Sequence, residues 1–483
     1  MIYLSEQQME DIGLRFIIDQ LNTCTPYGDE LAANLKPFFP NEKKKLCEEL
    51  DNIGKIKDNY NGKDFANTFR ILSQFKDIRP SIKKCLQSEY VLNDVELFEL
   101  KNFLLNLEEL DEVLVTVQKT IKLTEPLPKK MPKALVLLDP EETRLRTFYI
   151  PDSATNELLE IRTEKRRLEA AIVAADNEEQ KRLLRDKRLI IVIAEEEQEL
   201  IVRRKLTTGI LSHAEDFFAN TGAIGRFDLL LQKGRLAIEN KTTRPVNSES
   251  QVLFDGVYNP YIAHLLKKNN REITPVSITL HKGTAILTGA NMGGKSVVLK
   301  TLILNILLFQ MGFYVFADKA RLPMFDFVFL VSEDLESAEK GLSSFAAEIV
   351  RLKEITENLE QGFSFAALDE FARGTNPSEG AALARAVALY LNKKNAISIL
   401  TTHYDNVSSP EFNNFQVMGL KNLNIDLFRK KLLPTGENSA ALIAEFMDYR
   451  LQQTNGDSDP PKDAVNICKM LNFPDEILNI LHK

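Results

Sequence analysis

Residues 284–300 read TAILTGANMGGKSVVLK and carry the clearest chemical pattern in the chain. An apolar run precedes the sequence G-x-x-x-x-G-K-S, and an apolar run follows it. Glycines permit a tight turn that aims backbone N–H groups at phosphate oxygens, and a helix N-terminus adds partial positive charge. The pattern therefore predicts a phosphate-binding loop between a strand and a helix. The predicted ATP contacts are Gly289, Ala290, Asn291, Met292, Gly293, Gly294, Lys295 and Ser296, with Lys295 on the β- and γ-phosphates and Ser296 on Mg²⁺.

Two further apolar runs end in polar side chains of the kind that ATP hydrolysis needs. Residues 363–370 read FSFAALDE, which predicts a strand that ends in two carboxylates. We expect Asp369 to hold Mg²⁺ and Glu370 to act as the general base on the attacking water. In the run AISILTTHYDN, His403 follows a third strand, where it either contacts the γ-phosphate or the water or is structural. The predicted catalytic set is Glu370, Lys295 and His403, and the predicted metal set is Ser296 and Asp369.

Residues 1 to about 125 are predicted to be all-helical. Ser5 is positioned to cap a helix that runs as far as Leu21, and further helical periods run through Phe65 to Phe75 and Val95 to Val117. The runs ALVLLDP and RTFYIPD between residues 135 and 150 resemble strands and predict a small hairpin. A connector, TTRPVNSES, marks a domain boundary near residue 250.

Residues 157–205 form a charged segment with twelve basic and twelve acidic side chains. Leu158, Ile161, Leu168, Ile172 and Ala175 fall on positions of a repeat with alternating three- and four-residue steps, which is typical of a coiled coil. The pattern predicts a helical arm with its tip at residues 177–179. Either the arm is an intramolecular hairpin with a solvated face, or it is a clamp for a rod-shaped partner.

The composition indicates a multidomain protein without a membrane segment. The chain has 483 residues, 44% of them apolar, a net charge of −8 and four separated cysteines. No run of about 18 apolar residues and no signal sequence is visible, so we expect a cytoplasmic protein with reduced thiols. A negative net charge is not typical of a protein that lives on nucleic acid, although a local basic groove would still bind DNA.

The order of the motifs resembles one known family. TGANMGGKS, GLSSFAAEI at residues 341–349, LDEFARGTNPSEG and TTHYDN resemble the ATPase domain of MutS proteins, which are ABC-type P-loop ATPases. The segments TPYGDELAANLKP and DIRPSIKK resemble the helical core of the same family. The resemblance implies a multidomain α plus α/β protein: a helical core or lever domain (1–134), a hairpin with a coiled-coil arm (135–250), a P-loop ATPase domain (251–440) and a helical dimerisation segment (441–483).

The resemblance also implies a dimer with ATP at the interface between the subunits. The partner would be a second copy or a MutS-like paralogue. Ser343 would match the signature serine that reaches the γ-phosphate bound by the opposite subunit. Arg373, Gly374 and Thr375 would match the loop that follows the two carboxylates. Ala290 and Ala372 depart from the family, because they replace a proline in the phosphate loop and a glycine after the carboxylates.

Two functions fit the resemblance. The first is a DNA-associated, mismatch-repair-related ATPase whose arms close around DNA, without direct mismatch reading because the Phe-x-Glu reader domain is missing. The second is an ATP-dependent reactivase of an adenosylcobalamin-dependent aminomutase such as lysine 5,6-aminomutase, because short MutS-like ATPases of that kind are known. A basic face on residues 157–205 would favour DNA, and interleaved acidic side chains would favour a protein client.

Overall fold

The computed structural model describes residues 2–87, 89–289, 294–332, 344–404, 406–419 and 448–455, together with Cys468 and Pro474. The chain forms two compact units. Unit 1 contains residues 1–21, 35–54 and 233–483, and unit 2 contains residues 22–34 and 55–232. Both units take segments from the first 134 residues. The domain boundaries expected at residues 134, 250 and 440 remain predictions.

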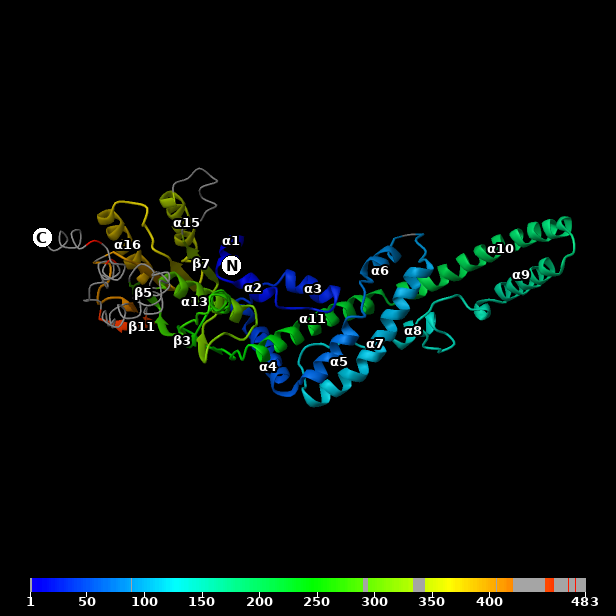
Figure 1. The fold of residues 1–483 in the computed structure, drawn as a ribbon, viewed down its shortest axis with the longest axis horizontal. Helices are drawn as coiled ribbons and strands as arrows, with labels where there is room; N and C mark the ends of the chain where they lie inside the picture. The colour runs from blue at the N-terminus through cyan, green and yellow to red at the C-terminus, as the bar shows by residue number, and fades with distance from the viewer. Residues whose placement is uncertain are drawn as a thin grey trace. The chain divides into compact units, whose positions relative to one another are not determined.

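The centre of unit 1 is a seven-stranded sheet with the order β1-β7-β8-β9-β5-β10-β11. Figure 1 labels its strands β5, β7 and β11. All neighbouring strands are parallel except the edge pair β10 and β11, which is antiparallel. Its strands are β1 (Ile2–Tyr3), β5 (Gly283–Thr288), β7 (Phe327–Val331), β8 (Ser364–Leu368), β9 (Ala396–Thr402), β10 (Asn413–Gly419) and β11 (Asp448–Thr454).

A second, mixed sheet of unit 1 has the order β2-β6-β3-β4. Its strands are β2 (Val246–Asn247), β3 (Gln251–Val257), β4 (Val276–His281) and β6 (Lys319–Leu322). Among its described residues, the helices that lie wholly in unit 1 are α1 (Glu6–Asp11), α2 (Leu14–Ile18), α12 (Pro260–Lys268), α13 (Lys295–Gln310), α15 (Ser344–Asn358) and α16 (Pro377–Asn392), with a 3-10 turn at Pro40–Glu42.

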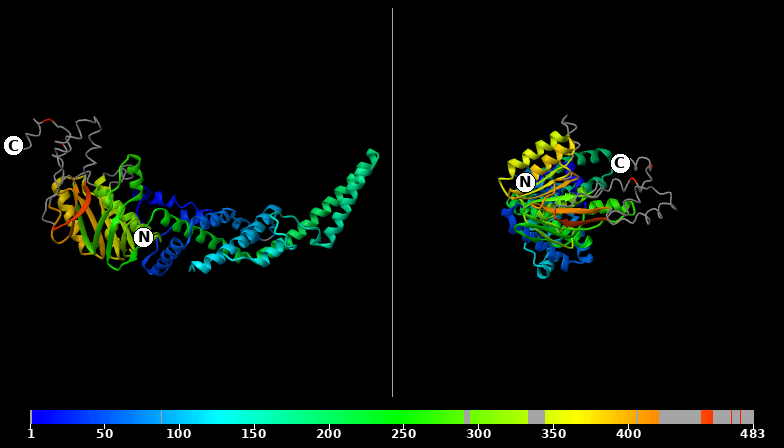
Figure 2. Two further views of the ribbon diagram at one scale, coloured as in Figure 1. Left: turned by 60° about the horizontal axis from the view of Figure 1, so that its bottom comes forward. Right: turned by 90° about the vertical axis from the view of Figure 1, so that its left-hand side faces the viewer.

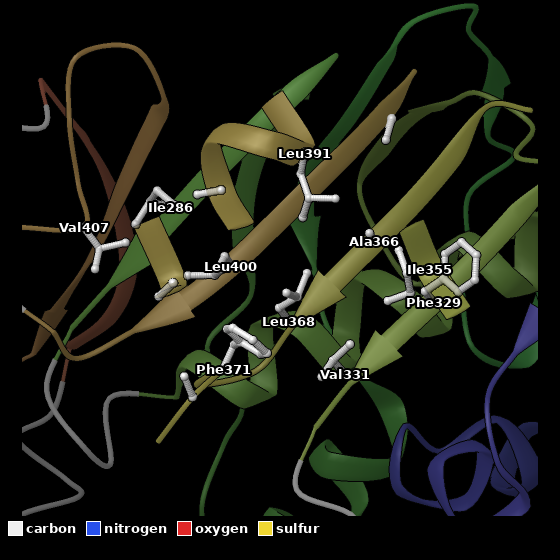
Figure 3. Close-up of a cluster of buried hydrophobic side chains, with 14 of the residues drawn as sticks. Ile286, Phe329, Val331, Ile355, Ala366, Leu368, Phe371, Leu391, Leu400 and Val407 are labelled. Carbon is white, nitrogen blue, oxygen red and sulfur yellow. The ribbon is translucent and has the colours of Figure 1, made fainter. Parts of the chain in front are cut away.

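Both faces of the larger sheet are covered, as is usual for parallel strands. Figure 3 shows one face, where side chains of β5, β7, β8 and β9 pack with Ile355 of α15 and Leu391 of α16. The alternate residues of these strands, such as Phe365 and Ile399, point to the opposite face and are also fully buried. Helix α13 is buried along nearly its whole length. Figure 2 shows the ribbon, with the strands of unit 1, from two further directions.

Unit 2 is helical in its described residues. It contains α3 (Pro26–Ala33), α5 (Gly62–Leu72), α6 (Arg79–Cys85), α7 (Asp94–Thr120), α8 (Pro132–Leu138), α9 (Asn156–Ala174) and α10 (Glu178–Leu211), with a 3-10 turn at Asp152–Ala154. The chain passes from one unit to the other inside α4 (Lys43–Asn59) and α11 (Ala214–Glu239). Among the described residues, no helix combines the length and apolar character that a membrane crossing requires.

The charged segment forms two helices, α9 and α10, that pack against each other as a hairpin. Asn177 precedes α10 and caps it, because its side chain accepts a hydrogen bond from the Gln180 N–H. Buried Leu158 and Val202 lie in a small cluster at the base of the α9–α10 hairpin. The two helices and their tip agree with the sequence pattern, whereas coiled-coil packing of the hairpin remains a prediction.

The prediction of a β-hairpin at residues 135–150 is wrong. Residues 132–138 form helix α8, which begins with Pro132 in its first turn. Ala134, Leu135 and Leu138 are buried, and this spacing fits one side of a helix. Asp139 then ends the helix and pairs with buried Lys101 at 3.0 Å. A short apolar run fits a buried helix as well as a strand, and here tertiary packing selects the helix.

Three smaller expectations also differ from the structure. The expected helix from Ser5 to Leu21 is divided into α1 and α2 by Gly13, whose φ is +85° and whose Cβ position would lie 2.5 Å from Tyr261. The first 134 residues are not entirely helical, because β1 pairs with β7. The segment 441–483 includes strand β11, which satisfies the backbone groups at the edge of β10, so a helix is wrong for residues 448–454.

Asp228 on α11 holds the start of α3 inside unit 2. Its Oδ2 accepts hydrogen bonds from the Cys24 N–H (2.9 Å), the Thr25 N–H (2.8 Å) and the Thr25 hydroxyl (2.8 Å). The residue has no exposed surface. Burial raises the pKa of Asp228 to about 6, although the three donors oppose this shift.

We expect Asp228→Asn to remove a pH dependence of stability. The folded state binds this proton more tightly than the unfolded state, whose carboxyl has its ordinary pKa of 3.8. The contribution of the group is therefore fully present below about pH 4 and is lost, by about 3 kcal/mol in total, as the pH rises through 6. Urea unfolding should show the variant gaining stability relative to the wild type over this range. Parallel pH profiles for the two proteins would contradict the assignment.

Candidate nucleotide-binding site

The candidate site lies at the carboxyl ends of three neighbouring parallel strands. Strand β9 pairs with β8 on one side and with β5 on the other. Gly289 follows β5, Asp369 follows β8, and His403 follows β9. Parallel neighbours end at the same edge of a sheet, and ligands of open α/β sheets bind outside that edge. The topology therefore brings together residues that the sequence separates.

The two described glycines of the phosphate-loop pattern have backbone conformations that favour glycine. The φ angles are +154° at Gly289 and +82° at Gly294. Helix α13 begins at the next residue, Lys295, so its free N–H groups lie at this end of the pattern. The Lys295 ammonium is buried and donates a hydrogen bond to the Gly289 carbonyl at 2.9 Å. This contact closes the two ends of the loop on each other.

Thr401 of β9 ties the two carboxylates to the neighbouring strand. Its hydroxyl donates to Oδ1 of Asp369 at 2.8 Å and accepts the Glu370 N–H at 2.8 Å. The Asp369 N–H donates to the carbonyl of Val331 on β7 at 2.7 Å. The acidic pair is thus fixed from both neighbouring strands of β8.

Glu370 lies between two cations. Its Oε1 is 3.2 Å from the Lys295 ammonium, and its Oε2 is 3.0 Å from the Arg373 guanidinium. Lys295 is almost completely buried, and Glu370 is mostly buried. The ion pair brings the lysine of the phosphate-loop pattern directly beside the predicted general base.

His403 faces Glu370 without a hydrogen bond. Its Nδ1 is 3.9 Å from Oε1 of Glu370, and this buried nitrogen has no hydrogen-bond partner within the described residues. Burial lowers the pKa of His403 below its ordinary value of 6.5; Glu370 opposes the shift, and Lys295 and Arg373 add to it. The neutral imidazole therefore predominates at pH 7, with Nδ1 turned toward the predicted base.

The residues present fit ATP with Mg²⁺. Mg²⁺ prefers oxygen ligands and usually takes one or two from the protein, with the rest from phosphates and water. The Ser296 hydroxyl in the first turn of α13 and the Asp369 carboxylate supply oxygens of this kind. Among the described residues, no cluster of three or more His, Cys, Asp or Glu side chains forms a metal site made by the protein alone. A metal held partly by phosphates is compatible with this arrangement.

Several predicted contacts lie outside the described residues, and other residues were not predicted. Ala290, Asn291, Met292, Gly293 and Ser343 are outside the described part of the chain. Sequence reasoning missed Thr401, whose partner atoms are on another strand. It also missed Tyr449, whose ring lies beside Gly294: a Cβ on Gly294 would lie 3.0 Å from Cδ1 of this ring. Only the pairing of β11 with β10 brings Tyr449 to this place.

Comparison with protein-family models gives a match in the region of the candidate site. Residues 285–479 match the family model described as MutS domain V. This range includes all the candidate site residues and covers less than half of the chain. Together with the relatives described next, it supports a MutS-family ATPase.

Curated proteins similar to this chain include three named Endonuclease MutS2. The one from Fusobacterium nucleatum is 34% identical over 232 residues, which cover 46% of this chain and 28% of the relative. One from Staphylococcus epidermidis is 32% identical over 233 residues, covering 48% and 29%, and one from Alkaliphilus oremlandii is 31% identical over 230 residues, covering 47% and 28%. The matched regions span less than a third of these relatives.

The environment of His403 leads to a titration experiment. The chain has five histidines, so their ring resonances can be followed individually by NMR, with His403 assigned through the variant His403→Asn. We expect the His403 ring to titrate below pH 6.5, because burial disfavours the imidazolium. The other histidines provide the comparison. A His403 pKa above 6.5 would show that Glu370 outweighs burial and would contradict the assigned neutral form.

Proposed function

We propose that this chain is a MutS-like ATPase that binds ATP with Mg²⁺ and hydrolyses it to ADP and phosphate. One observation carries the proposal: Lys295, at the start of α13, lies 3.2 Å from Glu370, which Thr401 holds beside Asp369. A phosphate-binding lysine, a metal-binding aspartate and a general base are the parts that phosphoryl transfer to water requires.

In the proposed reaction Glu370 accepts a proton from water. The water oxygen then forms a bond to the γ-phosphorus, and the bond from this phosphorus to the bridging oxygen breaks to release ADP. Lys295 stabilises the negative charge of the transferred group, and neutral His403 orients the water or the γ-phosphate. Mg²⁺, held by Ser296 and Asp369, would neutralise charge on the phosphates.

The far end of α13 supports the further proposal that nucleotide state is coupled to movement. Lys233 of α11 donates to the carbonyl of Met311 at the end of α13 (2.9 Å) and pairs with Glu49 of α4 at 2.7 Å. The Tyr314 hydroxyl donates to the Leu50 carbonyl of α4 at 3.3 Å. Helix α13 therefore begins at the candidate phosphate site and ends against the two helices that continue into unit 2.

The proposal includes a dimer, as in the MutS family that the sequence resembles. Each ATP would lie between two subunits, with Ser343 acting on the nucleotide of the opposite subunit. The partner is either a second copy or a MutS-like paralogue.

We expect Glu370→Gln to separate ATP binding from hydrolysis. Glutamine keeps the shape of the side chain but cannot accept the proton, so turnover should fall by a factor on the order of 10²–10⁴ while ATP still binds. The matched variant Lys295→Ala should instead lose ATP affinity, because the buried ammonium is gone. Steady-state turnover and equilibrium binding of a fluorescent ATP analogue distinguish the two effects. Normal turnover of Glu370→Gln would exclude Glu370 as the base.

DNA is the first candidate client, by resemblance to MutS proteins. In this hypothesis the α9–α10 hairpins of a dimer close around a duplex or a branched DNA in response to ATP. Contacts with phosphates would make any stimulation of the ATPase by DNA fall steeply as salt concentration rises.

A protein is the second candidate client, and the charges of the α9–α10 hairpin favour it. Arg166 pairs with Asp152 (3.0 Å), and Arg188 pairs with Glu169 (2.7 Å). Arg167 and Arg185 likewise lie within 4 Å of Glu164 and Glu178. Acidic side chains thus interleave with the arginines, which leaves fewer free cations for phosphates.

Exposed apolar side chains on α10 point to the same kind of client. Leu183, Leu189, Ile190 and Ile193 are each at least half exposed. Apolar surface of this kind is usual where a protein meets another protein, whereas DNA presents a charged backbone. An adenosylcobalamin-dependent aminomutase, which the chain would reactivate, is the specific form of this hypothesis.

One assay separates the two clients: ATPase rates at low and moderate salt, measured alone, with duplex, mismatched or branched DNA, and with the aminomutase. The double variant Ile190→Lys/Ile193→Lys adds cations to the exposed side of α10. If DNA is the client, stimulation is salt-sensitive and the variant strengthens it. If a protein is the client, no DNA changes the rate and the variant weakens stimulation by the aminomutase. Val173→Lys, at another highly exposed apolar position on α9, is the matched control.

A further inference from the structure

The turn after β8 has an unfavourable backbone conformation at two residues. The φ angle is +47° at Glu370 and +65° at Ala372, although neither is glycine. A left-handed conformation costs a residue with a Cβ about 1–2 kcal/mol. Such a turn persists when surrounding contacts hold it, and turns of this kind cluster at functional sites.

Two buried side chains hold the second of these residues. The Ala372 N–H donates to Oε2 of Glu348 at 2.8 Å, and the Ala372 carbonyl accepts from the Tyr404 hydroxyl at 2.8 Å. Ala372 has no exposed surface, and Glu348 is only 4% exposed. Without Glu348 the Ala372 N–H would be buried and unsatisfied, at a cost of about 1–3 kcal/mol. The Ala372 carbonyl also accepts a hydrogen bond from the Thr375 N–H at 3.4 Å, so Tyr404 adds a second, shorter contact there.

Both partners come from elements that bear on the proposed reaction. Glu348 is on α15, which begins at Ser344, the residue after the predicted signature serine. Tyr404 follows His403 directly, and the two rings are 4.4 Å apart between centroids. Burial, together with the nearby carboxylates of Glu348 and Glu370, raises the pKa of Tyr404, so its hydroxyl keeps the proton that it donates.

We propose that Glu348 and Tyr404 are positioning residues that hold the turn of Glu370 in the geometry needed for hydrolysis. This inference rests on the proposed ATPase function. Glu348 makes the position of the base depend on the position of α15.

A purely structural buried glutamate would have different consequences from a positioning residue. Loss of a structural contact would lower stability without a selective effect on the chemical step. Loss of positioning would lower kcat while ATP affinity stays the same, because the phosphate contacts of Lys295 and Ser296 are not part of this turn. The separation of kcat from ATP affinity is therefore the decisive measurement.

The test compares Glu348→Ala with the conservative variant Glu348→Gln. Alanine removes the acceptor for the Ala372 N–H, and we expect kcat to fall on the order of 10²-fold with little change in ATP affinity. Glutamine keeps an acceptor oxygen, so Glu348→Gln should restore most of the rate. Glu357→Ala, an exposed position on the same helix, is the matched control.

A double variant tests whether Glu348 acts through Glu370. In Glu348→Ala/Glu370→Gln the base is already gone, so the rate should equal that of Glu370→Gln alone. A further loss in the double variant would contradict an action through the base. A folded Glu348→Ala protein with the wild-type kcat would overturn the proposal outright.

A second single variant keeps the test decisive if Glu348→Ala does not fold. Tyr404→Phe removes only the hydroxyl that donates to Ala372, and we expect a lower kcat with unchanged ATP affinity. Wild-type kcat in Tyr404→Phe would then overturn the proposal. Absence of ATP hydrolysis by the wild-type chain, with its dimer partner present, would instead contradict the proposed function itself.

Discussion

Strand β9 hydrogen-bonds to β8 on one side and to β5 on the other, and the arrangement of the candidate site depends on this pairing. The register sets Leu368 against Leu400 and Thr288 against Thr402. The chain segments that leave these strands therefore start at the same edge of the sheet. Thr401 uses this register directly, because its hydroxyl reaches both Asp369 and the Glu370 N–H.

Lys295 lies in the first turn of helix α13, and this position calls for a negative charge nearby. The N-terminus of a helix carries partial positive charge, so the ammonium of Lys295 in its first turn is unfavourable unless negative charge lies nearby. Glu370, 3.2 Å away, supplies that charge, and phosphates bound at the same end would supply more. At the other end the dipole favours a cation, and Lys233 donates there to the Met311 carbonyl. The two lysines thus connect opposite ends of one buried helix to different neighbours.

The parts of the site that the sequence predicted are local in the chain. The range 289–296 forms one pattern with its own strand and helix, and Asp369, Glu370 and His403 each follow an apolar run that became a strand. Their proximity follows from parallel topology. By contrast, Thr401 and Glu348 lie inside the runs TTHYDN and GLSSFAAEI, but the local pattern gave neither residue a role. Their contacts, like the approach of Tyr449 to Gly294, are with residues far along the chain.

The wrong predictions have a related physical cause. Short apolar runs such as residues 134–138 satisfy helix and strand patterns equally, and only the neighbours of Ala134 and Leu138 decide between them. The interleaved order of the two units was also hidden, because α4 and α11 each cross a unit boundary without any change of helical pattern. Long, periodic segments such as α9 and α10 were more predictable, since their pattern repeats over many turns.

Ala372 shows how a departure from the family pattern can be tolerated. The resemblance to MutS proteins implies a glycine at this position, and the φ of +65° is a conformation that glycine adopts without steric cost. Alanine at this φ adds a strain of about 1–2 kcal/mol. The bond from its N–H to a buried carboxylate contributes roughly 1.5–3 kcal/mol, which is enough to offset the strain. The same contact that lets the chain keep an alanine here therefore fixes the backbone two residues from Glu370.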